Sequence, residues 1–502
     1  MHTTSDPRGT RLGRTAARID AATPPHRDRA VDALRALAIL GVVLGHWLVT
    51  ALVANGDTLR TASPLASMPW LAPVSWTFQT LAVFFMVGGH VATRSYTAAR
   101  KKARDADRGR GEGRATGRAP GEGRTTDSAV FAGEATQAAG ARREAFRDGA
   151  TGGLRVEASE RQRGVYATWL RARLARLFLP VAALVGVWAT VAVCLLLGGA
   201  SFVTVHTVVK LALSPLWFLL VFAGLTAATP LLARLNPLWP LVVVLHVDLV
   251  RFGLGGPAWL GWVNLAAGWA VPYTLGAAWT RGELEGRRAG WILLTGGAVV
   301  TAALVMWGGY PASMVGVPGK DVSNLNPPTL AAVTFGLAQC GLALLLRGRL
   351  RRAMSRPRAW AAVALLNLSA MTVFLWHQTA LMATTTLTLP AGHFPGLHTL
   401  PDTPAWIPYR LLWLPAFALV LAVCWAAFHG WETRTGRRGG RRAEVSRVVR
   451  TRDGGAVNGT PSSDAGRSER PGAARKSAYR LTARKPSVPS PESTALKGAN
   501  GA

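Results

Sequence analysis

The chain has 502 residues and a formal net charge of +31, yet 49% of its residues are hydrophobic. A soluble chain of this charge would not reach that hydrophobic content, so the composition indicates an integral membrane protein. A strongly basic balance can also mark nucleic-acid-binding proteins. Here, however, the arginines fall in alternate segments between long apolar runs. That placement excludes a nucleic-acid partner and is typical of a multi-pass membrane protein.

Apolar runs of the length needed to cross a bilayer occur ten times along the chain. A membrane-spanning helix needs roughly 20 consecutive apolar residues. The fifth run is the shortest and carries His246 and Asp248. We therefore expect an all-α bundle of about ten transmembrane helices, at residues 31–54, 74–93, 177–199, 216–233, 238–253, 258–280, 290–308, 329–346, 361–387 and 407–429.

Basic residues orient these spans. Alternate loops are rich in arginine, whereas the other set holds few basic residues, namely Arg60, Lys210, Arg251 and Lys320. Because basic loops remain in the cytoplasm, both termini are expected there. The sequence thus predicts a multi-pass protein of the plasma membrane with a basic cytoplasmic segment at 1–29 and a transmembrane domain at 30–432.

Two segments differ from the apolar runs in composition. Residues 97–164, between the second and third spans, are rich in Gly, Ala and Arg, and residues 433–502 are rich in Ser, Pro and Arg. Neither can bury a hydrophobic core, so both are predicted to be disordered and cytoplasmic. Their basic character favours contact with anionic membrane lipids.

The first apolar run contains Arg35 and His46, eleven residues apart. Helical residues advance about 100° each, so the two side chains share one face about 16 Å apart along the axis. Asp32 lies within about 60° of that face. Ionisable groups inside a span usually serve a function. The structural alternative is an ion pair between Asp32 and Arg35, with His46 as a hydrogen-bonded core histidine.

Two further groups of residues could act with this pair. Arg171 and Arg173 open the third span, where guanidinium groups could bind phosphates, although the orientation rule alone would also place arginines there. His377 lies about 24 Å along the ninth span and His46 about 22 Å along the first, so the two could line one cavity. A core histidine bonded to a backbone carbonyl is the alternative for His377.

The remaining candidates have plain structural alternatives. Trp217 begins the fourth span, where an aromatic belt residue is expected. Asn324 and Asn326 belong to a proline-rich outer loop that could recognise a hydroxylated acceptor, or simply form a turn before a helix. Gly88 and Gly89 permit close helix approach. The three cysteines lack metal-ligand spacing, so no metal is expected.

These motifs occur in an order that resembles the membrane acyltransferase-3 family, multi-pass enzymes similar to O-antigen and peptidoglycan O-acetylases. The resemblance covers about 30–430 without the insert, and the proline-rich loop resembles an actinobacterial-type branch. The family often has Ser-Gly after its paired phenylalanines, where this chain has Gly88-Gly89. The matching motifs are Arg35-x10-His46, Phe84-Phe85…Gly89, Arg171-x-Arg173, Trp217-Phe218-Leu219 and Phe374-Leu-Trp-His377.

The resemblance implies transfer of an acyl group, with acetyl expected, from a cytoplasmic acyl-CoA to a hydroxyl of an extracytoplasmic carbohydrate or secreted metabolite. His46 would be the base or carry the acyl group, and Arg35 would contact the donor or steady the site. Arg171 and Arg173 would hold the nucleotide of the donor, and His377 would support His46 or the acceptor. Acyl-CoA, expected to be acetyl-CoA, is a co-substrate, and no tightly bound cofactor is implied.

Other functions remain open at this point. The expected partners are membrane lipids, acyl-CoA and a glycan or small-molecule acceptor, while the acyl group, the acceptor and the oligomeric state stay undetermined. A secondary transporter of a sugar or lipid precursor is the main alternative, but transporters often show repeats and broken helices that this sequence does not reveal. A membrane scaffold acting through its basic segments is the third possibility.

Overall fold

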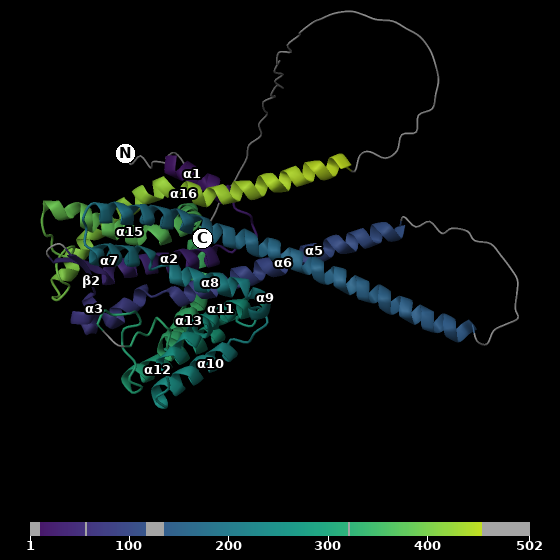
Figure 1. The fold of residues 1–502 in the computed structure, drawn as a ribbon, viewed down its shortest axis with the longest axis horizontal. Coiled ribbons are helices and arrows are strands. Elements are labelled where there is room, and N and C mark those ends of the chain that lie inside the picture. Colours follow the sequence, from purple (N-terminus) through teal and green to yellow (C-terminus); the bar gives the residue numbers. More distant parts are fainter. Residues whose placement is uncertain (1–10, 56–57, 117–134, 320–321, 454–502) are drawn as a thin grey trace, which may run out of the picture. The chain divides into compact units, whose positions relative to one another are not determined.

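The structure is a computed structural model that describes residues 11–55, 58–116, 135–319 and 322–453. The chain divides into two compact units, Met1–Arg442 and Ala443–Ala502. The described part is almost entirely helical, with one two-stranded antiparallel hairpin formed by β1 (Ala51–Asn55) and β2 (Thr58–Ala62) (Figure 1).

The helices follow in chain order. They are α1 (Arg11–Ala21), α2 (Arg29–Val49), α3 (Pro64–Ser67), η1 (Pro69–Leu71), α4 (Ala72–Ser75), η2 (Trp76–Phe78), α5 (Leu81–Thr116), α6 (Ala135–Leu197), α7 (Phe202–Leu213), α8 (Leu216–Ala227), α9 (Thr229–Leu232), α10 (Leu238–Asp248), η3 (Leu249–Gly253), η4 (Ala258–Trp262), α11 (Val263–Thr280), α12 (Arg287–Met306), α13 (Leu330–Ala353), α14 (Pro357–Leu368), α15 (Ala370–Thr388), η5 (Leu389–Ala391) and α16 (Trp406–Asp453).

Several helices are long and apolar enough to cross a membrane, so the multi-pass helical class is confirmed. Within the described residues there are seven such segments, and a pair bent by 73°, Pro357–Leu368 with Ala370–Ala391, would make an eighth. The expected spans at 238–253 and 258–280 correspond to α10, which has 11 residues, and α11, which has 18. The seven segments are Arg29–Val49, Pro69–Arg108, Ser159–Leu197, Phe202–Ala227, Arg287–Met306, Leu330–Ala353 and Trp406–Gly430.

The centre of the bundle depends on close contact between α5 and α11. A Cβ atom at Gly89 would lie 2.0 Å from the carbonyl oxygen of Tyr273, and one at Gly276 would lie 1.9 Å from that of Met86. No side chain fits at either position, so both glycines are required for the two backbones to touch. The close approach predicted from Gly88 and Gly89 is therefore present, and most of α11 is buried.

Helices α12 and α13 pack together in the same manner. A Cβ at Gly341 would lie 2.4 Å from the backbone nitrogen of Leu294, and one at Gly297 would lie 2.6 Å from that of Ala338. Further along the contact, the hydroxyls of Thr301 and Thr334 are hydrogen-bonded at 2.9 Å. Small residues and a buried hydroxyl pair thus fix the position of α13 against α12.

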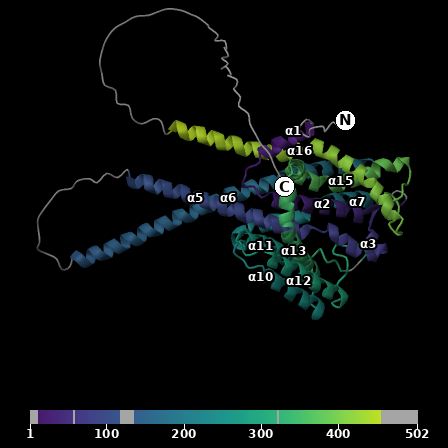
Figure 2. The same cartoon turned by 180° about the vertical axis from the view of Figure 1, so that it is seen from behind.

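The disorder predicted for the insert and the tail stays a prediction, although parts of both segments lie in described helices. α5 includes 97–116, α6 includes 135–164, and α16 continues to Asp453, while 117–134 and 454–502 lie outside the described residues. Figure 2 shows α5 and α6 each continuing as one long helix. The flanks contain many Ala and Arg residues, which are strong helix formers, together with several Gly residues. They extend helices whose costly first turns form within the apolar spans, so low hydrophobicity does not end the helix.

Candidate active site

The structure brings His46 of α2 together with His377 and Gln378 of α15. The two imidazole rings have centroids 5.0 Å apart in an edge-on arrangement. His46 Nδ1 lies 2.7 Å from Gln378 Nε2, across 332 residues of sequence. α2 also contacts the backbone of α15, because Trp47 Nε1 donates a hydrogen bond to the carbonyl of His377 at 2.9 Å. The two intramembrane histidines therefore share one site.

Two polar atoms of this cluster are buried without a hydrogen-bond partner among the described residues. They are Nε2 of His377 and Oε1 of Gln378. His377 Nδ1 lies 2.6 Å from the carbonyl oxygen of Phe374 and donates to it, which leaves Nε2 as a lone-pair acceptor. Buried polar atoms are normally paired, so these two atoms can accept hydrogen bonds from a ligand or an ordered water. His46 is only partly buried, so it faces the accessible side of the cluster.

Arg35 contacts α14 in the same way that His46 contacts α15. Arg35 Nε donates to Oδ1 of Asn367 at 2.6 Å, and Asn367 Nδ2 donates to the carbonyl of Asp32 at 2.8 Å. The carboxylate of Asp32 forms an ion pair with Arg27 at 2.6 Å. Arg35 therefore has an amide partner on another helix. The structural alternative from the sequence was an ion pair between Arg35 and Asp32, and the structure shows Asp32 in an ion pair with Arg27.

The two contacts are matched along the chain. Eleven residues separate Arg35 from His46, and eleven also separate Asn367 from Gln378. α2 and the α14–α15 segment therefore run in the same direction, with one contact at each end of the matched stretch. The 73° bend between α14 and α15 lies inside that stretch.

An aromatic cluster surrounds the histidines. Phe374 lies 5.9 Å from His377 and 5.3 Å from Phe218, measured between ring centroids. Phe85 continues the cluster, 5.1 Å from Phe218. The motifs that are far apart in the sequence thus meet in space, because the Phe84-Phe85, Trp217-Phe218 and Phe374 segments all contribute. Trp217 is partly buried at the edge of this cluster, 6.3 Å from Trp269.

Arg410 of α16 supports the end of α2, and sequence reasoning missed it. Its side chain is fully buried, with 0% exposure. It donates to the carbonyls of Trp47 at 2.7 Å and Gly396 at 3.1 Å, and also to that of Thr50. The last carbonyls of a helix lack intrahelical partners and carry partial negative charge, so a cation stabilises them. A lone arginine inside the last apolar run was the available signal.

Arg171 and Arg173 do not act as one unit. Residues two apart on a helix point about 200° away from each other. Arg171 is exposed, whereas Arg173 is partly buried and donates to Ser95 Oγ at 2.6 Å and to the carbonyl of Val91 at 3.2 Å. Arg173 therefore joins α6 to α5, whereas Arg171 projects from α6 into the surroundings.

The outer-loop asparagines also differ. Asn324 is fully buried, donates to the carbonyls of Pro311 and Ser313 at 2.6 and 3.0 Å, and accepts from the Thr329 hydroxyl at 2.6 Å. These bonds close the loop before α13, as the turn alternative predicted. Asn326 is exposed.

The helical bundle, with its several long apolar helices and buried polar cluster, is that of a multi-pass membrane protein. A family model described as an acyltransferase domain, that of the acyltransferase-3 family, matches residues 147–429. The match covers more than half of the chain, and the chain belongs to this family. No curated protein and no solved structure matches it.

The matched region contains only one side of the candidate site. His377, Gln378 and Asn367 lie inside residues 147–429, whereas Arg35 and His46 precede them. The contacts described above are what join α2 to the matched region. Among the described residues no group of three or more His, Cys, Asp or Glu side chains could hold a metal ion.

Proposed function

We propose that this protein transfers an acyl group, with acetyl as the expected group, from acyl-CoA to a hydroxyl of an extracytoplasmic carbohydrate or secreted metabolite. Membership of the acyltransferase-3 family supports acyl transfer by a membrane protein. The main observation in support of an active site here is the contact of His46 with Gln378. It lies beside Nε2 of His377, which has no hydrogen-bond partner among the described residues. Histidine is the side chain whose ordinary proton affinity suits it to accept and return a proton near neutral pH.

In this proposal His46 Nε2 takes the proton of the acceptor hydroxyl. The oxygen then attacks the thioester carbonyl, and the CoA thiolate leaves and takes up a proton. For Nε2 to be basic, Nδ1 must carry the ring proton. A half-turn of the Gln378 amide would set its unpaired Oε1 against Nδ1–H and hold that tautomer. His46 as a transient acyl carrier would need the same tautomer.

The proposal also includes a route for the donor. We propose ten spans with both termini in the cytoplasm, in the plasma membrane: the seven clear segments, the bent α14–α15 pair as an eighth, and α10 and α11. Arg35 would then lie toward the cytoplasmic side and His46 deeper in the membrane. Acyl-CoA would enter from the cytoplasm, where the exposed Arg171 can contact its phosphates and Arg173 keeps α6 in place.

A secondary transporter is the second candidate, because one observation favours it. α14 and α15 form a helix pair bent by 73°, and broken helices are typical of transporter binding sites. The sequence did not reveal this break. Transporters of this kind usually carry a second broken helix in a related half of the chain. In the described residues there is a single such pair, which leaves acyl transfer as the better-supported function.

Purified protein in nanodiscs tests the two functions. Release of CoA thiol from acetyl-CoA should depend on added hydroxylated acceptors and should fall by about a hundred- to ten-thousand-fold in His46→Ala. The matched control is His206→Ala, because His206 is exposed on α7. Normal CoA release by His46→Ala would contradict the proposal. Uptake of a sugar by proteoliposomes without any CoA release would establish the transporter.

A further inference from the structure

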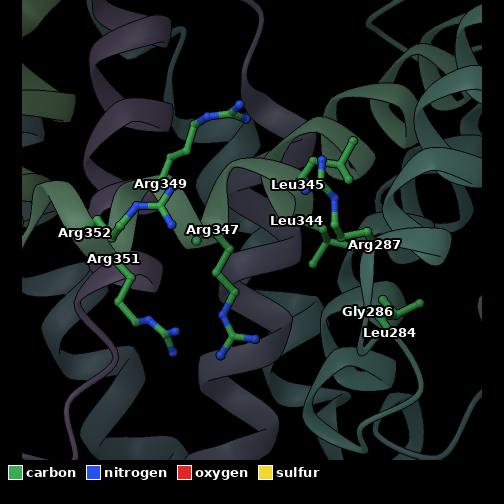
Figure 3. Close-up of a pocket in the computed structure, with 10 residues that line it drawn as sticks. Leu284, Gly286, Arg287, Leu344, Leu345, Arg347, Arg349, Arg351 and Arg352 are labelled. Carbon is green, nitrogen blue, oxygen red and sulfur yellow. The ribbon is translucent and has the colours of Figure 1, made fainter.

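A cavity of about 510 Å³ lies between the start of α12 and the end of α13. Five arginines line it: Arg287 from α12 and Arg347, Arg349, Arg351 and Arg352 from α13. Figure 3 shows Arg347 and Arg351 extending in the same direction from α13, with Arg287 contributed by the facing segment. No acidic side chain lines this cavity. We call it the arginine pocket, and its volume is that of a small-molecule site.

Two glycines belong to the lining of the arginine pocket. Gly348 lies on the α13 wall, and a Cβ placed there would meet no atom within 4 Å. Gly286 precedes α12 with a φ of +92°, which a residue with a side chain rarely adopts. The first turn of α12 follows directly, and its free N–H groups add positive potential on that side of the pocket.

The charges of the arginine pocket are largely unbalanced within the described part of the chain. Arg347 is the one pocket arginine with an ion pair there, to Asp28 at 2.9 Å. The orientation rule accounts for arginines at this end of α12 and α13. It does not explain why arginines from both helices line one concave space. Guanidinium groups that line one space are stabilised by an anion bound among them, and their planar forks match phosphate oxygens.

We propose that the arginine pocket binds the phosphate groups of an anionic ligand. Two sources have this chemistry: the nucleotide end of acyl-CoA, and the headgroup of an anionic phospholipid at the membrane surface. The first source rests on the proposed acyl transfer, whereas phosphate binding itself does not.

A ligand in the arginine pocket would affect α2, the helix that carries Arg35 and His46. Asp28 pairs with Arg347 and also caps α2, accepting hydrogen bonds from the backbone nitrogens of Ala30 and Val31 at 3.1 and 3.3 Å. A phosphate bound to Arg347 competes for the same guanidinium. A ligand in the pocket is therefore linked to the start of α2 through the side chains of Arg347 and Asp28.

Two variants and two matched controls test the proposal. The double change Arg287→Gln and Arg351→Gln removes one charge from each wall, and Gly348→Leu fills the pocket while keeping every arginine. The control for charge is Arg288→Gln with Arg358→Gln, which changes exposed arginines outside the lining. The control for the glycine change is Gly296→Leu on α12, where an added Cβ also meets nothing within 4 Å.

Binding is measured without turnover, so the result is independent of catalysis. In the first arm, CoA and 3′-dephospho-CoA are titrated into protein held in phosphatidylcholine nanodiscs. In the second, native mass spectrometry counts phosphatidylglycerol retained by protein from mixed phosphatidylglycerol–phosphatidylcholine vesicles. Loss of a charge-assisted contact should weaken binding at least about tenfold.

Each outcome decides between the possibilities. Weaker CoA binding in both pocket variants, but in neither control, supports the nucleotide source. Unchanged or absent CoA binding with loss of retained phosphatidylglycerol supports the lipid source, and would leave phosphate binding in place even if the acyl-CoA donor were wrong. If neither CoA binding nor phosphatidylglycerol retention changes in either pocket variant, the proposal is overturned.

Discussion

The contact between Gln378 and His46 allows a sharp prediction about catalysis. Gln378→Met keeps the approximate volume of the side chain but removes the amide that lies 2.7 Å from His46 Nδ1. The imidazole then loses the partner that fixes its ring orientation and tautomer. We expect kcat for acyl transfer to fall while KM for acetyl-CoA stays nearly unchanged, because an orienting group acts on the base rather than on donor binding.

The size of the effect follows from burial. Gln378 is fully buried, so water cannot take over its hydrogen bond to the ring. Leaving a buried polar group unpaired costs about 1–3 kcal/mol, which corresponds to about a 5- to 150-fold loss in kcat. Removing the proposed base by His46→Ala should cost about a hundred- to ten-thousand-fold. If Gln378 acts through His46, the double variant should be no slower than His46→Ala alone.

The assay is CoA release by wild type, the two single variants and the double variant, each in nanodiscs and each with its melting temperature recorded. Gln339→Met is the matched control, since Gln339 is a partly buried glutamine on α13 that donates to the carbonyl of Trp76. Full activity of Gln378→Met would refute the reasoning. So would a double variant whose loss equals the product of the two single losses, because independent effects would place Gln378 outside the histidine site.

Three further predictions concern stability, measured as melting temperature in detergent. Gly276→Ala should lower the melting temperature by several degrees, because the new Cβ would lie 1.9 Å from the Met86 carbonyl oxygen and overpacking costs about 1–3 kcal/mol. Gly296→Ala is the control and should leave the melting temperature unchanged, because its Cβ meets nothing within 4 Å. Arg410→Met should lower the melting temperature similarly, because it leaves backbone carbonyls unpaired. Arg410→Lys should not restore the melting temperature, since an ammonium lacks the planar fork. An unchanged melting temperature would contradict the anchoring role of Arg410. Burial alone would raise the pKa of Asp28, but hydrogen bonding and the charge of Arg347 hold it below 3.8. The advantage of wild type over Asp28→Asn should therefore be constant from pH 7 to about 5 and disappear only as the pH falls through that lowered pKa; its loss near pH 6 would argue against this pair.

The part of the site that local geometry determines was predictable. Arg35 and His46 share a face because the period of a helix is the same wherever it occurs. Their partners were not predictable, since Asn367 and Gln378 lie 332 residues further along the chain and one sequence without an alignment carries no sign of such contacts. Arg410 was missed for the same reason, because its acceptors are backbone carbonyls, which every residue has.

Helix boundaries show a different limit. The second and third spans were predicted to end where apolar residues stop, yet the helices continue with Ala, Arg and Glu to Thr116 and back to Ala135. Hydrophobicity determines which residues are buried in the bilayer, whereas helix propensity and an existing nucleus determine where the helix ends. For the predicted spans at 238–253 and 258–280, hydropathy is instead a weak guide to which residues are buried. α11 is mildly apolar but largely buried by neighbouring helices, so hydropathy alone does not define its place.

The two matched contacts lie on either side of the bend between α14 and α15. Asn367 lies before the bend and Gln378 after it, so a change in the bend angle would move one relative to the other. α2 is a single helix without a proline, and its contacts with both residues therefore resist such a change. Ser369, at the bend, also accepts a hydrogen bond from Trp425 Nε1 at 2.6 Å. The position of Gln378 against His46 thus depends on Arg35 holding Asn367. A loss of turnover in Arg35 variants is consequently expected even where the donor still binds, because the contact that orients the base is set from the other end of the same helix.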